Sequence, residues 1–177
     1  AIVGRTGCGK TTVIDLLSRV YNPPENSIYF DDNDNYKVPL ETLRSNLVMV
    51  PQEIFLFSDT VANNISLGKN KATREEIVEV TKKAKVHSSI IEFENGFDTV
   101  IGERGVTLSG GQKQRLAIAR ALLTDPNILI LDDALSAVDT KTEKSILDDL
   151  IKMRKDKTTI IISHRISSIQ HADKIIV

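Results

Sequence analysis

Two hydrophobic patterns alternate along this chain of 177 residues. Short, mostly apolar runs at residues 47–50, 128–131 and 158–162 have the length and continuity of strands buried on both faces of a parallel sheet. Between them, apolar residues recur at helical spacing, as in residues 11–21 and 142–154. Strands that alternate with amphipathic helices predict an α/β fold with a doubly wound, mostly parallel sheet.

The strand pattern nearly disappears between residues 52 and 107, where helix-start signals take its place. Residue pairs with the spacing of N-terminal capping boxes mark two such starts. They are Thr73 with Glu76 and Ser109 with Gln112. We therefore expect a helical subdomain over about residues 53–125, inserted into one domain that spans residues 1–177.

Both ends of the chain are apolar. Residues 1–3 and 174–177 read as strands that have been cut short, so we expect truncated terminal strands and a domain that belongs to a longer chain. Further elements are predicted as a strand at residues 27–30 and as short helices at residues 40–44 and near Ile166.

Composition and charge exclude several classes of protein. The chain is 41% apolar and 27% charged, as in soluble folded domains, which argues against disorder and against a coiled coil. Lys and Arg total 23 against 24 Asp and Glu, so the basic excess expected of a protein that binds nucleic acid through phosphates is absent. No apolar run approaches the ~20 residues of a membrane helix. The single cysteine, Cys8, excludes an intrachain disulfide.

The first turn of the chain fits a phosphate-binding pattern. Residues 4–11 read G-R-T-G-C-G-K-T, which matches G-x-x-x-x-G-K-[ST] between a predicted strand and a predicted helix. Lys10 is expected to reach the β- and γ-phosphates of a nucleotide, and the Thr11 hydroxyl to bind Mg²⁺. The alternative is a glycine-rich turn with a solvated lysine. The expected nucleotide-binding residues are Gly4, Arg5, Thr6, Gly7, Cys8, Gly9, Lys10, Thr11 and Thr12.

A carboxylate follows the most apolar strand. Asp132 ends the run at residues 128–131, at the end of the strand where an open parallel sheet presents its ligands. We expect it to hold Mg²⁺, directly or through water. Taken alone, the same residue could be a helix N-cap after a strand.

One motif distinguishes between the classes of phosphate-loop proteins that the first turn leaves open. It is the run Leu108-Ser109-Gly110-Gly111-Gln112. With this LSGGQ motif the sequence resembles the ATP-binding cassette (ABC) family, and the resemblance covers essentially the whole chain. A helix start with a serine cap and two glycines is also a second anion site, although it is equally an ordinary helix cap. Further matches, in chain order, are the lid glutamine in Pro51-Gln52, the D-loop Ser136-Ala137-Val138-Asp139 and the switch histidine in Ser163-His164-Arg165.

The resemblance implies a P-loop NTPase fold whose helical subdomain lies between the glutamine loop and the signature motif. It implies ATP and Mg²⁺ as ligands, with Gln52 also binding the metal, and catalytic roles for Gln52, Asp133 and His164. In this family the signature residues bind the ATP held by a partner domain, and Ser136 and Asp139 are the D-loop residues that the resemblance implies. Two domains thus enclose two ATP molecules head to tail.

The stretch I-G-E-R-G at residues 101–105 resembles exporter-type members of the family. It implies that Glu103 and Arg104 form a coupling surface for the membrane domains, although a charged turn is the alternative. We expect the nucleotide-binding domain of an exporter, with transmembrane domains fused N-terminally, at the cytoplasmic face of the plasma membrane. The alternatives are a soluble cassette ATPase that acts as a clamp in repair or translation, or an ATP-gated binding module without useful turnover.

One residue departs from the family pattern. Active members carry a glutamate after the magnesium aspartate, and this sequence has Asp133, which is shorter by roughly 1.5 Å. A misplacement of about 1 Å can cost on the order of a hundredfold in rate. We therefore expect this chain's own site to hydrolyse ATP slowly, as in the degenerate half of a heterodimeric multidrug-type exporter. A homodimer with two slow sites is the alternative, and the retained His164 favours residual activity.

Overall fold

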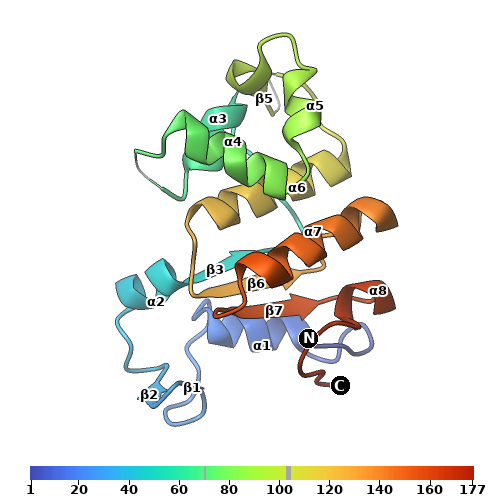
Figure 1. The fold of residues 1–177 in the computed structure, drawn as a ribbon. Helices are drawn as coiled ribbons and strands as arrows, with labels where there is room; N and C mark the ends of the chain where they lie inside the picture. The colour runs from blue at the N-terminus through green and yellow to red at the C-terminus, as the bar shows by residue number, and fades with distance from the viewer. Residues whose placement is uncertain (70, 103–104) are drawn as a thin grey trace.

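The computed structural model describes residues 1–69, 71–102 and 105–177. The expected coupling residues Glu103 and Arg104 therefore lie outside the described residues. Figure 1 shows a central sheet with α1 on one side and α6 and α7 on the other, and a helical lobe beyond α6. This is the layered α/β architecture that the alternating strand and helix patterns predict, so that prediction is confirmed.

The central sheet consists of three parallel strands in the order β3-β6-β7. They are β3 (Leu47–Val50), β6 (Ile128–Asp132) and β7 (Thr158–Ile162). The register pairs Val50 with Leu131 and Asp132 with Ile162. Because the strands are parallel and in step, their carboxyl ends lie along one edge of the sheet.

The terminal apolar runs pair with this sheet only briefly. Ile2 forms isolated parallel bridges with Ile162 and with Ile176, and neither run is a full strand in the structure. The expectation of truncated terminal strands agrees with these single bridges, because each end contributes one paired residue rather than a ladder.

The helices that cover the sheet are α1 (Lys10–Leu17), α6 (Gly110–Leu123) and α7 (Thr140–Met153). The prediction of a helix to residue 21 was too long, because the chain reverses after Ser18 and Arg19 adopts φ 52°. The backbone N–H groups of Val20 and Tyr21 both donate to the carbonyl of Asp15, which closes this turn. Helix α7 begins two residues before the predicted start because the Asp139 side chain caps it.

The helical lobe contains α3 (Val61–Ser66), α4 (Arg74–Lys83), α5 (His87–Ile91) and the 3₁₀ turn η1 (Gly96–Asp98). A two-stranded antiparallel pair, β4 (Asp59–Thr60) with β5 (Val100–Ile101), closes it. Both predicted capping boxes are confirmed, each with its reciprocal pair of hydrogen bonds.

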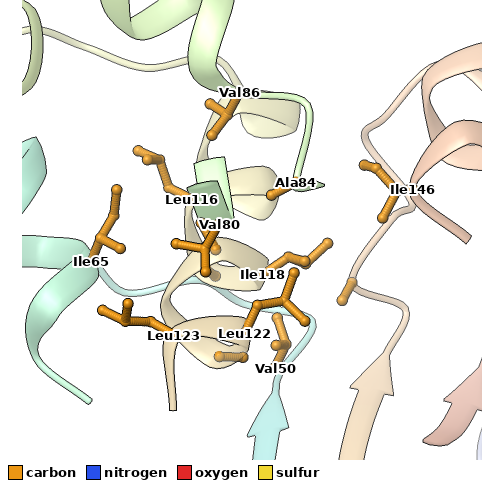
Figure 2. Packing of buried hydrophobic residues seen from close by; sticks show 14 of the residues in the cluster. Val50, Ile65, Val80, Ala84, Val86, Leu116, Ile118, Leu122, Leu123 and Ile146 are labelled. Atoms are coloured by element: carbon orange, nitrogen blue, oxygen red, sulfur yellow. The ribbon is translucent and has the colours of Figure 1, made fainter. Parts of the chain in front are cut away.

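One hydrophobic cluster joins the lobe to the sheet. Figure 2 shows α6 at its centre, with Leu116 and Leu123 on the side of Val80 of α4 and Ile65 of α3, and Leu122 next to Val50 of β3. The same cluster continues through Ile118 to side chains of β3 and α7. The signature helix is therefore the shared packing element between the two parts of the domain.

The remaining elements are α2 (Leu40–Asn46), α8 (Ile166–Ile169) and the short pair β1 (Tyr29–Phe30) with β2 (Asn33–Asp34). The strand predicted at residues 27–30 is shorter than expected because only its last two residues pair. Within the described part of the chain, no helix has both the length and the apolar character to cross a membrane.

Candidate nucleotide site

The carboxyl edge of the sheet brings together segments that are far apart in the sequence. Gln52 follows β3, Asp132 ends β6 with Asp133 directly after it, and His164 follows β7. The bridge between Ile2 and Ile162 directs the glycine-rich turn that starts at Gly4 to the same edge. The parallel register thus gathers the first turn, the glutamine, the two aspartates and the histidine at one edge.

The glycine-rich turn is closed by its own lysine. The Lys10 ammonium group donates to the carbonyls of Gly4 at 2.8 Å and Arg5 at 3.0 Å. Gly7 and Gly9 adopt φ 83° and 98°, in the left-handed region that glycine tolerates. The lysine charge is therefore held across the turn, where phosphate oxygens can replace the two carbonyls. The side chains of Arg5, Thr6, Cys8, Thr11 and Thr12 are exposed beside it.

Asp132 is buried, with 8% of its surface exposed. Burial raises the pKa of its carboxyl group above the ordinary value, and the neighbouring carboxylates of Asp133 and Asp15 raise it further. The nearby Lys10 and His164 side chains oppose this shift of the Asp132 pKa. An ionised carboxylate in this position is stabilised by an added cation.

The residue types at this edge fit Mg²⁺. The Asp132 carboxylate, the Thr11 hydroxyl and the Gln52 amide all offer oxygen ligands, which Mg²⁺ prefers. A magnesium ion that also binds nucleotide phosphates needs only one or two protein ligands. Among the described residues, no group of three or more His, Cys, Asp or Glu side chains is placed to hold a metal on its own.

We expect Asp132→Asn to stabilise the nucleotide-free protein and to remove its response to Mg²⁺ and ATP. The raised pKa means that stability falls as the pH rises from the unfolded pKa of this group through the folded one, so at neutral pH the ionised carboxylate destabilises the fold. The neutral amide should raise the Tm by a few degrees. Thermal unfolding with and without ATP and Mg²⁺ measures both effects. The exposed Asp156 provides the control, because Asp156→Asn should leave both Tm values nearly unchanged.

Asp133 and His164 face each other. An Asp133 carboxylate oxygen (Oδ2) lies 3.5 Å from His164 Nε2, and the aspartate side chain is 13% exposed against 53% for the histidine. The backbone of Asp133 adopts φ 45°, and its N–H donates to the carbonyl of Ile162 at 3.0 Å. Aspartate is among the residues that accept this backbone conformation most readily.

The signature residues form the start of α6. The Ser109 hydroxyl accepts from the N–H of Gln112, and the Gln112 side chain accepts from the N–H of Ser109. A Cβ at Gly111 would lie 2.8 Å from the carbonyl oxygen of Ala137, so only glycine allows this contact with the D-loop. Leu108 is buried, whereas Ser109 and the following glycine are exposed.

The sequence reasoning assigned no role to Gln114, which is buried and holds the D-loop. Its amide nitrogen (Nε2) donates to the Ser136 hydroxyl at 2.9 Å, and its amide oxygen (Oε1) accepts from the N–H of Ala137 at 2.8 Å. One indication of this role was present in the sequence, because Gln114 is a polar residue on a face of the predicted helix that is otherwise apolar. Asp139 has a local role, because its side chain caps α7 through the N–H of Thr142.

Comparisons with known proteins agree with this geometry. A family model described as "ABC transporter" matches residues 1–136. The chain is 52% identical over 99% of its length to the multidrug resistance-like ATP-binding protein MdlA of Escherichia coli, of which it covers 30%. It is 47% identical over its full length to an ATP-dependent lipid A-core flippase of Photorhabdus laumondii, of which it covers 31%.

A solved structure of a bacterial Atm1-family ABC exporter with ATP bound is similar in fold. It superposes with a TM-score of 0.93 at 45% identity, over 98% of this chain and 31% of that one. The chain thus spans about 30% of the length of the relatives that it matches.

Proposed function

This chain belongs to the ABC transporter family, and we propose on that premise that it binds and hydrolyses ATP to power export by a larger membrane protein. The observation that carries the proposal is the shared edge of the sheet. There the lysine-closed glycine turn, the buried Asp132 and the pair of Asp133 and His164 come together. This set of groups suits phosphoryl chemistry, in which positioning and charge stabilisation do most of the work.

Each group has a role in this proposal. Lys10 and the N–H groups of the turn bind the phosphates, and Thr11, Asp132 and Gln52 hold Mg²⁺. The metal, when bound, neutralises charge on the phosphate oxygens. Asp133 orients the attacking water, and His164 contacts the γ-phosphate.

The signature residues serve a second nucleotide, held by a partner domain. Support comes from the fold, because α1 and α6 lie on opposite sides of the sheet in Figure 1. The phosphate loop and the LSGGQ helix start therefore approach from different faces. Two such domains placed head to tail would each complete the other's site, with Ser136 and Asp139 of the D-loop beside the signature.

The larger protein contains membrane domains fused N-terminally in this proposal, and the chain lies at the cytoplasmic face of the plasma membrane. The names of the relatives include a lipid flippase and multidrug export proteins. Phe55 and Phe57 are 67% and 50% exposed and pack edge to face with ring centroids 4.9 Å apart. They offer an apolar surface for the membrane domains, and the described Gly102 lies close to Ser58, which follows Phe57. This function involves no nucleic acid.

Because Asp133 replaces the longer glutamate, the chain's own site hydrolyses ATP more slowly than a site with that glutamate would. We propose that the partner is a different nucleotide-binding domain with a competent site, and that the intact signature of this chain completes it. A homodimer with two slow sites is the second arrangement that Asp133 allows.

Expression of the full-length protein tests the proposed function. The protein should sediment with membranes, and after purification it should hydrolyse ATP only when Mg²⁺ is present. A soluble protein that hydrolyses ATP would favour the clamp ATPase, and a membrane protein that binds ATP without turnover would favour the gated binding module.

We expect Ser109→Arg to block ATP-driven association of two nucleotide-binding domains while leaving ATP binding to the chain's own loop nearly intact. A bulky cation at the exposed helix start fills the pocket meant for the partner's phosphate. Fluorescent-nucleotide binding and crosslinking of the two domains measure the two effects. Ser45→Arg, on the exposed surface of α2, is the matched control. Loss of ATP binding in Ser109→Arg would mean that the signature acts within its own chain.

A further inference from the structure

An ion pair joins the buried Glu143 to Arg165, the residue that follows His164 in the chain. Glu143 of α7 has no exposed surface, and one of its carboxylate oxygens (Oε2) lies 2.5 Å from an Arg165 guanidinium nitrogen (Nη1). The Ser168 hydroxyl donates to the other carboxylate oxygen. The Arg165 side chain is 39% exposed, so only the carboxylate is removed from water. A buried carboxylate costs free energy unless it is paired and hydrogen-bonded, so Glu143 depends on these contacts, and they fix the orientation of the guanidinium group.

Arg165 uses its remaining donors on the loop that follows the two aspartates. Its guanidinium group donates to the carbonyls of Ser136 at 2.6 Å and Val138 at 2.8 Å, and more weakly to Leu135 at 3.4 Å. These three carbonyls belong to residues 134–138, which connect Asp133 to the start of α7. A single side chain thus holds most of this loop by its backbone.

The same loop is held from the opposite side by Gln114 of α6. In addition to its bonds to Ser136 and Ala137, the Gln114 amide donates to the carbonyl of Asp133 at 3.4 Å. The loop is therefore fixed between the signature helix and the segment that contains the switch histidine. Neither Gln114 nor Arg165 donates a hydrogen bond to the glycine-rich turn in the described structure.

We propose that Arg165, oriented by Glu143, is a positioning residue for ATP hydrolysis. Arg165 follows His164 in the chain and binds the loop that follows Asp133, so it sets the distance between these two side chains. It also sets the backbone of the D-loop, which the proposed dimer presents to the partner's nucleotide. This inference rests on the proposed function, and it predicts an effect on turnover whichever of the two sites hydrolyses ATP.

The test compares variants of the full-length protein. Arg165→Met removes every donor of the guanidinium group, and it should lower kcat about tenfold or more, because sub-ångström placement controls turnover. The KM for ATP and the affinity for a fluorescent nucleotide should change less than about twofold, since the phosphate loop is untouched. Arg165→Lys keeps the charge beside Glu143 but loses the forked set of guanidinium donors. Its kcat should therefore lie between those of the wild-type protein and Arg165→Met.

Arg154 provides a matched control. Like Arg165, it binds backbone carbonyls through its guanidinium group: it donates to the carbonyls of Pro126 and Thr158 and to the Thr159 hydroxyl, each at 3.0 Å. It lies at the amino end of β7, away from the candidate site. Arg154→Met should lower the Tm but leave kcat per folded molecule unchanged.

The pair of Glu143 and Arg165 is tested by a double-mutant cycle. Glu143→Gln should lower kcat, and adding it to Arg165→Met should cause little further loss, because both act through the same contact. The proposal is overturned if Arg165→Met keeps the wild-type kcat per folded molecule, or if Arg154→Met loses kcat equally. If these results occur while Lys10→Ala still abolishes turnover, the ATPase function stands and only the positioning role fails. A wild-type protein without any turnover would overturn both.

Discussion

Lys10→Ala is expected to weaken ATP binding by on the order of a hundredfold or more, because it removes charge-assisted hydrogen bonds to the phosphates. In the structure the Lys10 ammonium already lies across the glycine-rich turn, bound to the carbonyls of Gly4 and Arg5. The lysine is therefore placed before the nucleotide arrives, and little ordering of its side chain is needed on binding. Titration of a fluorescent ATP analogue into the full-length protein measures the loss.

The control for this change is Lys155→Ala. Lys155 is exposed and lies between α7 and β7, at the opposite edge of the sheet. It carries the same charge, so its removal tests whether net charge alone affects affinity. Unchanged affinity in Lys10→Ala, or an equal loss in Lys155→Ala, would contradict the assignment of the phosphate loop.

The strands and helix starts could be predicted because their causes are local in the sequence. Residues 47–50 and 158–162 were predicted as strands with the bounds that the structure has, since each is a mostly apolar run between polar breaks. The helices that begin at Arg74 and Gly110 were located by their capping boxes, in which the side chains three residues apart satisfy each other's backbone groups.

Other features depend on contacts that the sequence does not reveal. The early end of α1 is caused by the turn at Arg19, and the terminal runs are limited to bridges through Ile2. Gln114 and Arg165 bind a loop more than 18 residues away in the chain, at separations from 19 to 30 residues. No local pattern indicates such partners, because they depend on how α6 packs against β3 and how α8 packs against α7.

The candidate site also combines features with local causes in the sequence and features that depend on distant contacts. The order of the motifs and the parallel sheet predict which residues meet at the carboxyl edge, and the roles of these residues remain predictions. The left-handed backbone of Asp133 and its approach to His164 could not be predicted, because they depend on the hydrogen bond between Asp133 and Ile162 of β7.

Asp133→Glu is expected to raise ATP turnover by this chain's own site, roughly tenfold or more, if the short reach of aspartate limits the reaction. The added methylene extends the carboxylate toward the position of the attacking water. Glutamate tolerates φ 45° less well than aspartate does, so the same change should lower the Tm slightly. A gain in turnover together with a loss in stability is therefore specific to a catalytic effect.

The matched change is Asp133→Asn, which removes the charge without altering the length. In the proposed heterodimer it should cost little, because most turnover comes from the partner's site, whereas replacing the partner's matching glutamate by glutamine should nearly stop the complex. Turnover is measured in the assembled dimer, since water attack also needs the partner's signature against the γ-phosphate. If Asp133→Asn alone eliminates the ATPase activity of the full transporter, Asp133 is a working base and the slow-site proposal is wrong.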